Sequence, residues 1–302
     1  MRAKFLLIAA ALSTAAVSMT PAYAQNTPSS RTQAEIQAAW QAAAKSGTFG
    51  PAQIRLLDQA TLNITDDEVF IPAAEANRIM AALGNSSTPE RFGLVTEKSD
   101  NVRWMVDVTW IKEGYVRDGD AKEWQADAML EDLKEGTERG NAERLARGIP
   151  ALDVTGWVEK PAYDSASHRL VWSLSLQDRG APAGQPQTIN YNTYALGREG
   201  YFSLDLITGS DTIGTDKLVA RNLLGTLNYR PGKRYEDFSS STDKVAAYGL
   251  GALVGVVAVK KLGLLGLIGV FLLKIWKLAA VALVGAGAAV RRFFGRQKED
   301  AA

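Results

Sequence analysis

The chain has 302 residues, a formal net charge of +1 and no cysteine, which excludes disulfides, thiolate nucleophiles and thiolate metal ligands. The charge is divided unevenly, because residues 25–242 hold 23 Lys or Arg against 30 Asp or Glu, whereas residues 243–302 hold 9 against 3. The acidic region lacks the positive field that nucleic-acid binding requires, so we expect no nucleic-acid partner. The single histidine, His168, excludes a multi-histidine metal site.

The N-terminal residues have the three-part pattern of a secretory signal peptide. Arg2 and Lys4 precede an apolar stretch at residues 5–12, and residues 22–24 (AYA) form the small-x-small sequence that signal peptidase accepts. An uncleaved membrane helix is disfavoured because the apolar core is shorter than the roughly 20 residues of a span. We therefore predict that residues 1–24 are a cleaved signal peptide.

Residues 25–242 are predicted to form one exported soluble domain, because no repeat and no long linker divides them. A capping-box pattern at residues 32–35, followed by apolar residues at helical spacing, predicts a first helix that ends at Gly47. Apolar periodicity predicts further helices at residues 72–84, about 121–147 and 216–227. Asp118, Asp120 and Glu123 cluster like part of a calcium loop, but Asp120 and Glu123 are better explained as the capping box of the 121–147 helix.

The strongest strand pattern lies at residues 102–111 (VRWMVDVTWI), where Trp104, Val106 and Val108 alternate with other side chains at a period of two. Similar runs follow at residues 152–158, 169–176, 188–196 and 201–207, and two shorter ones lie around 54–56 and 62–64. Turn residues rather than long helices separate most of these runs. The predicted fold class is therefore α+β, an antiparallel sheet with flanking helices.

Residues 243–290 are predicted to form a C-terminal transmembrane helical anchor. Lys260-Lys261 and Lys274 with Lys277 divide this apolar tract into pieces shorter than a comfortable span of about 20 residues. We favour one principal crossing at about residues 262–283, in which lysines near the ends snorkel to the headgroups, and three short crossings are the alternative. By the positive-inside tendency, the basic tail 291–302 lies in the cytoplasm. This topology predicts a protein of the cytoplasmic membrane whose soluble domain faces the periplasm or the cell exterior.

Two glycines of the tract suggest helix packing. Gly251 and Gly255 form a small-xxx-small pair, which lets two helix backbones approach closely inside a bilayer. The surrounding glycines also look like a dinucleotide-binding loop, but no strand precedes them and no acidic ribose partner follows. We therefore expect helix packing here, and no cofactor.

The apparent catalytic motifs do not fit an enzyme. Residues 241–244 (STDK), 99–101 (SDN) and 45–47 (KSG) match motifs of penicillin-binding enzymes, but their order along the chain is reversed. His168 is preferred as a hairpin-turn residue over a general base, because the sequence places no serine or carboxylate partner with it. No catalytic or metal-binding residue is therefore assigned.

Several separate stretches together resemble an uncharacterised bacterial family of membrane-anchored proteins, domain of unknown function 2167. They are residues 70–74 (FIPAA), 114–116 (GYV) with Asp118 and Trp124, 163–164 (YD), 168–172 (HRLVW), 190–193 (NYNT), 196–200 (LGREG), 234–238 (RYEDF) and 243–249 (DKVAAYG). The resemblance covers nearly all of the mature chain. It implies the architecture described above, but no activity, cofactor or catalytic residue.

The leading functional hypothesis is a non-enzymatic binding or scaffolding domain that contacts the lipid bilayer and binds an envelope protein or a second copy of itself. The candidate ligand surface is a polar and aromatic stretch formed by Asn190, Tyr191, Asn192, Tyr194, Arg198 and Glu199. An ordinary strand that ends in a satisfied turn is the preferred interpretation of this stretch. One alternative is an envelope hydrolase that uses carboxylates, for which Asp107, Asp118, Asp120 and Asp205 are the raw material. Another is an oligomeric membrane assembly through the glycines of the anchor.

Overall fold

The computed structural model describes residues 30–255, apart from residues 84, 86, 99–103, 123 and 147–149. The predicted signal peptide, the SDN motif, most of the predicted anchor and the basic tail lie outside the described residues. Among the helices that the structure does describe, none is long and apolar enough to span a membrane.

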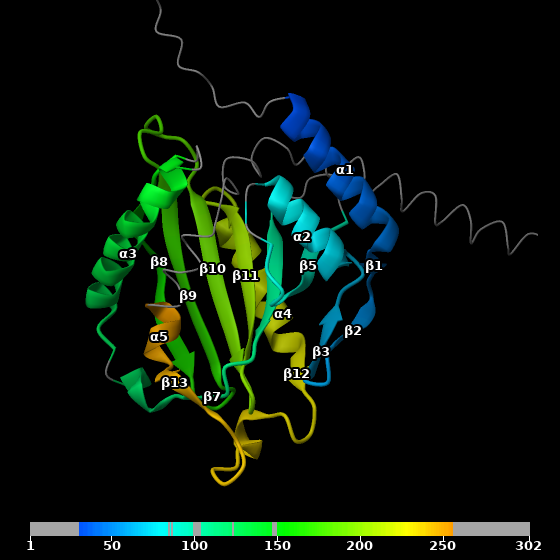
Figure 1. Cartoon of the computed structure of the whole chain (residues 1–302), viewed down its shortest axis with the longest axis vertical. Helices are drawn as coiled ribbons and strands as arrows, with labels where there is room; N and C mark the ends of the chain where they lie inside the picture. Colours follow the sequence, from blue (N-terminus) through cyan, green and yellow to red (C-terminus); the bar gives the residue numbers. More distant parts are fainter. Residues whose placement is uncertain are drawn as a thin grey trace, which may run out of the picture.

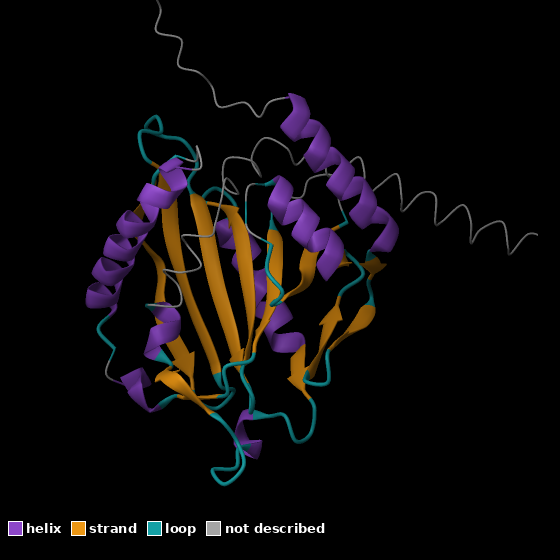
Figure 2. Ribbon diagram, in the orientation of Figure 1, coloured by secondary structure: helices purple, strands orange, loops and turns teal. Residues whose placement is uncertain are grey.

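The core of the fold is an eight-stranded sheet in which every neighbouring pair is antiparallel (Figures 1 and 2). Its strands, in spatial order, are β1 (Thr48–Phe49), β4 (Glu68–Pro72), β5 (Arg91–Glu97), β6 (Met105–Ile111), β11 (Tyr201–Gly209), β10 (Thr188–Leu196), β9 (Arg169–Asp178) and β8 (Leu152–Asp164). The predicted α+β class with an antiparallel sheet is confirmed.

Two small sheets accompany the large one. The first contains β2 (Ala52–Leu56), β3 (Ala60–Ile64) and β12 (Leu227–Tyr229). The second pairs β7 (Tyr115–Arg117) in parallel with β13 (Val245–Gly249), so a segment that begins the predicted anchor is hydrogen-bonded to the domain.

One face of the large sheet is covered by α4 (Ile213–Thr226), which Figure 1 shows behind the strands, and by the β2-β3-β12 sheet. Alternate residues of the central strands point into this core, among them Val106, Val108, Leu204 and Leu206. Trp110 and Phe202 pack there with ring centroids 4.6 Å apart. Burial of each such large apolar side chain contributes about 1.5–3 kcal/mol to stability. Because alternate residues of a strand share one face, burial of that face requires apolar residues at every second position, as in residues 102–111.

The opposite face carries two separate groups of helices (Figure 1). At one end, α1 (Ser30–Ser46) and α2 (Ala73–Ala82) bury apolar side chains at helical spacing against β4 and β5. At the other end, α3 (Ala126–Ala146), the 3-10 turn η1 (Gly119–Lys122) and α5 (Gly251–Val254) pack over β8, β9 and β10. A second 3-10 turn, η2 (Tyr235–Asp237), lies at the lower end of the sheet in Figure 1.

Two sequence-based expectations change in the structure. The long helix begins at Ala126 rather than near Ala121, and the Asp120 carboxylate accepts hydrogen bonds from the N–H groups of Leu250 and Gly251. Asp120 therefore caps α5. The long helix begins only at Ala126, six residues after Asp120. Residues 245–254, which the sequence assigns to the anchor, form β13 and α5, so the folded domain extends to at least Val254.

Candidate functional site

Polar side chains lie on the central strands of the large sheet, on the face between the two helix groups. In the strand register, Asn192 on β10 pairs with Asp205 on β11, and Asp205 pairs with Asp107 on β6. Residues two positions along a strand share a face, which adds three further polar residues to this row. We call the set Asp107, Thr109, Asn190, Asn192, Ser203 and Asp205 the polar strip. All six side chains are buried, with exposed fractions of at most 8%.

A buried ion pair forms one end of the polar strip. Arg91 on β5 binds both carboxylate oxygens of Asp107 at 2.9 Å, and its other terminal nitrogen donates to Asn77 of α2 at 2.6 Å. Such a pair gains little net stability, because desolvation offsets most of the Coulomb attraction, but losing one partner leaves a buried charge uncompensated. Both Asp107 oxygens accept hydrogen bonds from one guanidinium, and this bidentate geometry fixes the orientation of the carboxylate.

The middle of the polar strip contains both hydrogen-bonded and unsatisfied polar atoms. Ser203 donates a hydrogen bond of 2.7 Å to Asp205, and the amide nitrogen of Asn192 lies 3.3 Å from the Asn190 carbonyl oxygen. By contrast, Asn190 Oδ1 and Thr109 Oγ1 are buried and have no hydrogen-bond partner among the residues that the structure describes. A buried unsatisfied polar atom costs about 1–3 kcal/mol, so these two atoms mark a place where a hydrogen-bond donor would be stabilising.

Apolar side chains border the polar strip on both sides. Met105 and Ile207 belong to the α1–α2 side, whereas Trp172 and Tyr194 belong to the side that contains α5. The pKa of Tyr194 is raised well above its usual value, first by burial and then by the negative charge of Asp205. The polar strip is therefore a narrow acidic and amide-lined region between two apolar ones.

A second cluster, which we call the histidine–tyrosine cluster, lies at the lower end of the sheet in Figure 1. It consists of Tyr115, Asp118, Tyr163, His168, Tyr235 and Phe238. Tyr163 donates a hydrogen bond of 2.8 Å to Asp118, and its hydroxyl oxygen lies 3.1 Å from His168 Nδ1. Since a phenol has one proton, His168 must carry a proton on Nδ1 to complete the second bond. The structure thus supplies the carboxylate and hydroxyl partners of His168 that the sequence could not place.

Aromatic stacking holds this cluster together. The His168 ring stacks on Tyr235 at a centroid distance of 4.1 Å, and Tyr115 stacks on both Tyr235 and Phe238, at 4.3 and 3.9 Å. Burial raises the pKa of Tyr163, and the hydrogen bond to Asp118 raises it further. The phenol therefore stays protonated and serves as a fixed donor to Asp118.

Beside the histidine–tyrosine cluster, the turn after β10 is fixed by ion pairs. Arg198 binds both oxygens of Asp243, at 2.7 and 2.8 Å, which lowers the pKa of Asp243, and the Ser239 N–H lowers it further. Glu199 binds Lys233 at 2.6 Å. Arg198 is therefore occupied by Asp243, the first residue of the predicted anchor tract, and Glu199 by Lys233.

The junction between the domain and the C-terminal tract is built from close backbone contacts. Gly114 has a positive φ of 98°, and a Cβ at this position would lie 2.5 Å from the Lys244 carbonyl oxygen. At Gly251, a Cβ would lie 3.0 Å from Asp120 Oδ2 and 3.1 Å from Trp124 Nε1. Glycine is needed here because another backbone or a carboxylate occupies the space of a side chain. In the described structure, Gly251 thus packs against the domain, whereas the nearest neighbour that a Cβ of Gly255 would meet is the Gly251 carbonyl oxygen at 3.8 Å.

The predicted ligand surface is distributed over three places. Asn190, Asn192 and Tyr194 point to the face of the polar strip, but Tyr191 points to the other face, where its hydroxyl donates to Glu159 and accepts from Arg221. Arg198 and Glu199 lie in the ion-paired turn beyond the strand. The structure therefore brings only Asn190, Asn192 and Tyr194 together on one face. Asp107 and Asp205 lie on the same face of the neighbouring strands. An acidic residue within an otherwise apolar strand, as in MVDVTW and LDL, was the sequence signal for these two.

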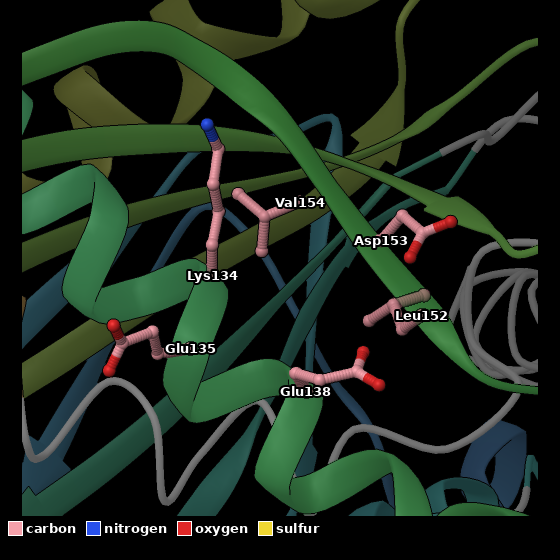
Figure 3. A pocket seen from close by; sticks show the side chains of 6 residues that line it. All are labelled: Lys134, Glu135, Glu138, Leu152, Asp153 and Val154. Atoms are coloured by element: carbon pink, nitrogen blue, oxygen red, sulfur yellow. The ribbon is translucent and has the colours of Figure 1, made fainter.

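A surface depression of about 440 Å³ lies between α3 and β8 and is lined by Lys134, Glu135, Glu138, Leu152, Asp153 and Val154 (Figure 3). Two of its carboxylates, Glu138 and Asp153, bind the same guanidinium of Arg179. An exposed ion-pair network therefore accounts for its charged lining. Across the described residues, no group of three or more His, Asp or Glu side chains is arranged to hold a metal ion.

These features define an α+β fold with a large antiparallel sheet, a buried polar strip and a C-terminal segment packed onto it. The chain belongs to the family described as protein of unknown function, DUF2167, whose model matches residues 48–285. No curated protein matches the chain in sequence. Among solved structures, it is similar to cyanobacterial PsbP (CyanoP) from Synechocystis sp. PCC 6803, with 7% identity, coverage of 59% of this chain and 92% of that chain, and a TM-score of 0.37.

Proposed function

We propose that this protein is an exported binding or scaffolding domain that is tethered to the cytoplasmic membrane by its C-terminal tract and held in a fixed orientation there. The observation that carries the proposal is the junction. β13 pairs with β7, Asp120 caps α5, and Leu253 and Val254 are fully buried in the domain. A flexible linker would suffice to keep an enzyme near a membrane, whereas a segment that is packed onto the domain as far as Val254 restricts the orientation of the domain relative to the tether.

The N-terminal and C-terminal sequences support the location. Residues 1–24 have the pattern of a signal peptide, and the lysine-divided apolar tract after residue 255 has the composition of an anchor followed by a basic tail. The partners in this proposal are the lipid bilayer and an envelope protein or a second copy of the chain.

A carboxylate-dependent hydrolase is the second candidate, and the direct pairing of Asp107 with Asp205 favours it. Hydrolysis by two carboxyl groups requires that one of them hold a proton to give to the leaving group. Both oxygens of Asp107 are bound by the Arg91 guanidinium, so this carboxyl group is already engaged by a cation of the domain. The binding role therefore ranks first.

Cysteine accessibility tests the proposed topology, and the absence of native cysteine makes the assay specific. One variant carries Ser240→Cys, at an exposed position before the tract, and the other carries Glu299→Cys in the basic tail. In spheroplasts, a membrane-impermeant thiol reagent is expected to label the first variant and to leave the second unlabelled until the membrane is permeabilised. Equal labelling of both before permeabilisation would contradict the proposal.

A further inference from the structure

We propose that Asp118, Tyr163 and His168 of the histidine–tyrosine cluster form a binding site for one first-row transition-metal ion. The carboxylate, the phenol and the imidazole lie side by side although they come from three segments of the chain. Asp118 follows β7, Tyr163 lies near the end of β8, and His168 is in the turn between β8 and β9. A metal ion here would bind the folded domain wherever the C-terminal tract lies, so its test is independent of the topology proposed above.

The three donor atoms have the spacing of ligands around one metal ion. Tyr163 Oη lies 2.8 Å from Asp118 Oδ2 and 3.1 Å from His168 Nδ1, and Asp118 Oδ2 lies 3.8 Å from His168 Nδ1. The point equidistant from these three atoms is therefore about 1.9 Å from each of them. Zinc binds imidazole nitrogen at about 2.0–2.1 Å and carboxylate oxygen at about 2.0–2.2 Å. An ion slightly out of the plane of the three atoms would thus lie at bonding distance from all of them.

The carboxylate of Asp118 has no permanent cation beside it. Its side chain is 30% exposed, and in the described part of the chain no lysine or arginine pairs with it. Its partners are the Tyr163 hydroxyl and His168, whose ring is charged only when it is protonated. A nearby opposite charge stabilises a partly buried carboxylate, and a metal ion would supply that charge. The partial exposure of Asp118 and His168 leaves the site open to an ion from solvent.

The imidazole is held in place before any ion binds. His168 has a φ of 53°, in the left-handed region, and its ring stacks on Tyr235 at a centroid distance of 4.1 Å. The hydroxyl of Tyr235 in turn donates a hydrogen bond of 2.9 Å to the Val116 carbonyl oxygen. Backbone strain of this kind is found at functional sites, where the surrounding structure fixes a side chain for a role. Fixed ligand orientation is also what a metal site requires, because it lowers the cost of assembling the ligands.

The donor set selects the class of ion. Ca²⁺ and Mg²⁺ take oxygen ligands, whereas an imidazole nitrogen suits zinc, iron, copper and nickel. Fe³⁺ is a hard cation, for which an anionic phenolate oxygen is a suitable donor. The protein supplies three ligands, so a bound ion would keep at least one position for water or another small ligand. Zn²⁺ and Fe³⁺ are therefore the two probes of choice.

Binding displaces a proton from the site. In the metal-free protein, Tyr163 donates its proton to Asp118, and His168 carries a proton on Nδ1. On binding, the Tyr163 proton is released to solvent, while the imidazole loses its proton at Nδ1 and gains one at Nε2, so that Nδ1 offers its lone pair. Burial and the hydrogen bond to Asp118 raise the pKa of Tyr163, which makes this release costly. A cation bonded to both oxygens offsets that cost, because it neutralises their mutual repulsion.

Equilibrium dialysis of the full-length, detergent-solubilised protein tests the site. The protein is prepared without a histidine tag, so that His168 is its only imidazole, and a chelator removes bound metal before Zn²⁺ or Fe³⁺ (as its nitrilotriacetate complex) is added. We expect one ion per chain. The variants Asp118→Asn, Tyr163→Phe and His168→Asn should each weaken binding by at least about tenfold, since loss of even an outer-shell partner costs about 10–100-fold. Asparagine tolerates the left-handed backbone at position 168, so this variant keeps the turn.

Asp164→Asn is the matched control. Asp164 is an exposed carboxylate of the same turn that accepts hydrogen bonds from the Ala166 N–H and the Ser167 hydroxyl. Its substitution removes a nearby negative charge but no proposed ligand, so it should weaken binding much less than the other three. Bound Fe³⁺ should also give a visible phenolate-to-iron charge-transfer band that Tyr163→Phe lacks. Binding of neither ion, equal binding by all four variants, or bound Fe³⁺ without this band would overturn the proposal.

Thermal stability supplies a measurement that needs no variant. An ion that binds only the folded state raises Tm, so Zn²⁺ should raise the Tm of the chelator-treated wild-type protein. Ca²⁺ at the same concentration should not, because a site with a nitrogen donor does not suit it. Equal shifts with the two ions would show that general cation binding, and not this donor set, is responsible, and would contradict the assignment.

Discussion

At the scale of single residues, His168 combines a strained backbone with a bonded side chain. Its φ of 53° lies in the left-handed region, which a histidine adopts at a cost of about 1 kcal/mol relative to glycine. The strain is tolerated because the ring is held by Tyr163 and stacked on Tyr235, and because the Leu196 N–H donates to the His168 carbonyl. The identity of this turn residue is thus explained by its side-chain contacts.

Tyr163→Phe tests the histidine–tyrosine cluster. The substitution removes the proton that Asp118 accepts and the oxygen that His168 binds, while the ring is retained. We expect the free energy of unfolding in urea to fall by about 1–2 kcal/mol, as for a partly buried hydrogen bond to a charged group. Arg139→Ala, in an exposed ion pair on α3, is the control and should change it by less than about 0.5 kcal/mol. An equal change in both variants would show that the Tyr163 hydroxyl is not stabilising.

At the scale of elements, the start of α5 depends on a side chain from a remote turn. Asp120 in η1 accepts hydrogen bonds from the N–H groups of Leu250 and Gly251, at 3.2 and 2.8 Å. A carboxylate at a helix N-terminus satisfies backbone donors that have no partner within the helix and interacts favourably with the helix dipole. The short helix is therefore stabilised by the domain and not by its own length.

Asp120→Ala is expected to loosen this junction. Loss of an N-terminal cap costs about 1–2 kcal/mol, so hydrogen exchange at the amides of residues 245–255 should become about tenfold faster. Asp127→Ala is the matched control, because Asp127 is exposed and only binds Lys160 on the surface. Unchanged exchange at residues 245–255 in Asp120→Ala would mean that the β7–β13 pairing alone holds the segment in place.

At the scale of the whole molecule, the fold buries tyrosine side chains on both faces of the large sheet. Burial is the largest cause of a raised pKa at seven described tyrosines, which are Tyr115, Tyr163, Tyr191, Tyr194, Tyr201, Tyr229 and Tyr235. For Tyr191 the pKa is raised to about 12. The folded state therefore binds these protons more tightly than the unfolded state does.

Stability should consequently fall at alkaline pH. When a folded-state pKa lies above the unfolded value of about 10, the folded state holds more protons, so the free energy of unfolding decreases as the pH rises above 10. We expect tyrosine ionisation, followed by absorbance at 295 nm, to rise in one cooperative step that coincides with loss of the far-UV circular dichroism signal. Gradual ionisation near pH 10 with the fold intact would show that these hydroxyls reach solvent.

Local patterns in the sequence determined the four longer helices, several strands and the fold class, but they did not predict β5, β7, β12 or β13. The alternation at residues 102–111 and the helical spacing after residue 32 predict β6 and α1. Each of these elements buries one face, so the spacing of its apolar residues shows whether it is a strand or a helix. The sequence likewise predicted an antiparallel sheet and named Asp107, Asp205 and part of the β10 surface. The same local reasoning assigned Asp120 to the cap of the helix that follows it. In the tertiary structure, Asp120 caps α5 instead.

Only the tertiary structure decided which of these residues meet. Asp107 lies opposite Asp205, His168 lies beside Asp118 and Tyr163, and Asp120 caps α5, although the partners are far apart in the chain. Strand order and register establish these contacts, and they depend on how whole strands pack, whereas local periodicity reports only which face of each strand is buried. For this reason the sequence by itself determined the longer helices, several strands and the fold class of this protein, and the three-dimensional packing determined its polar strip and the attachment of its C-terminal segment.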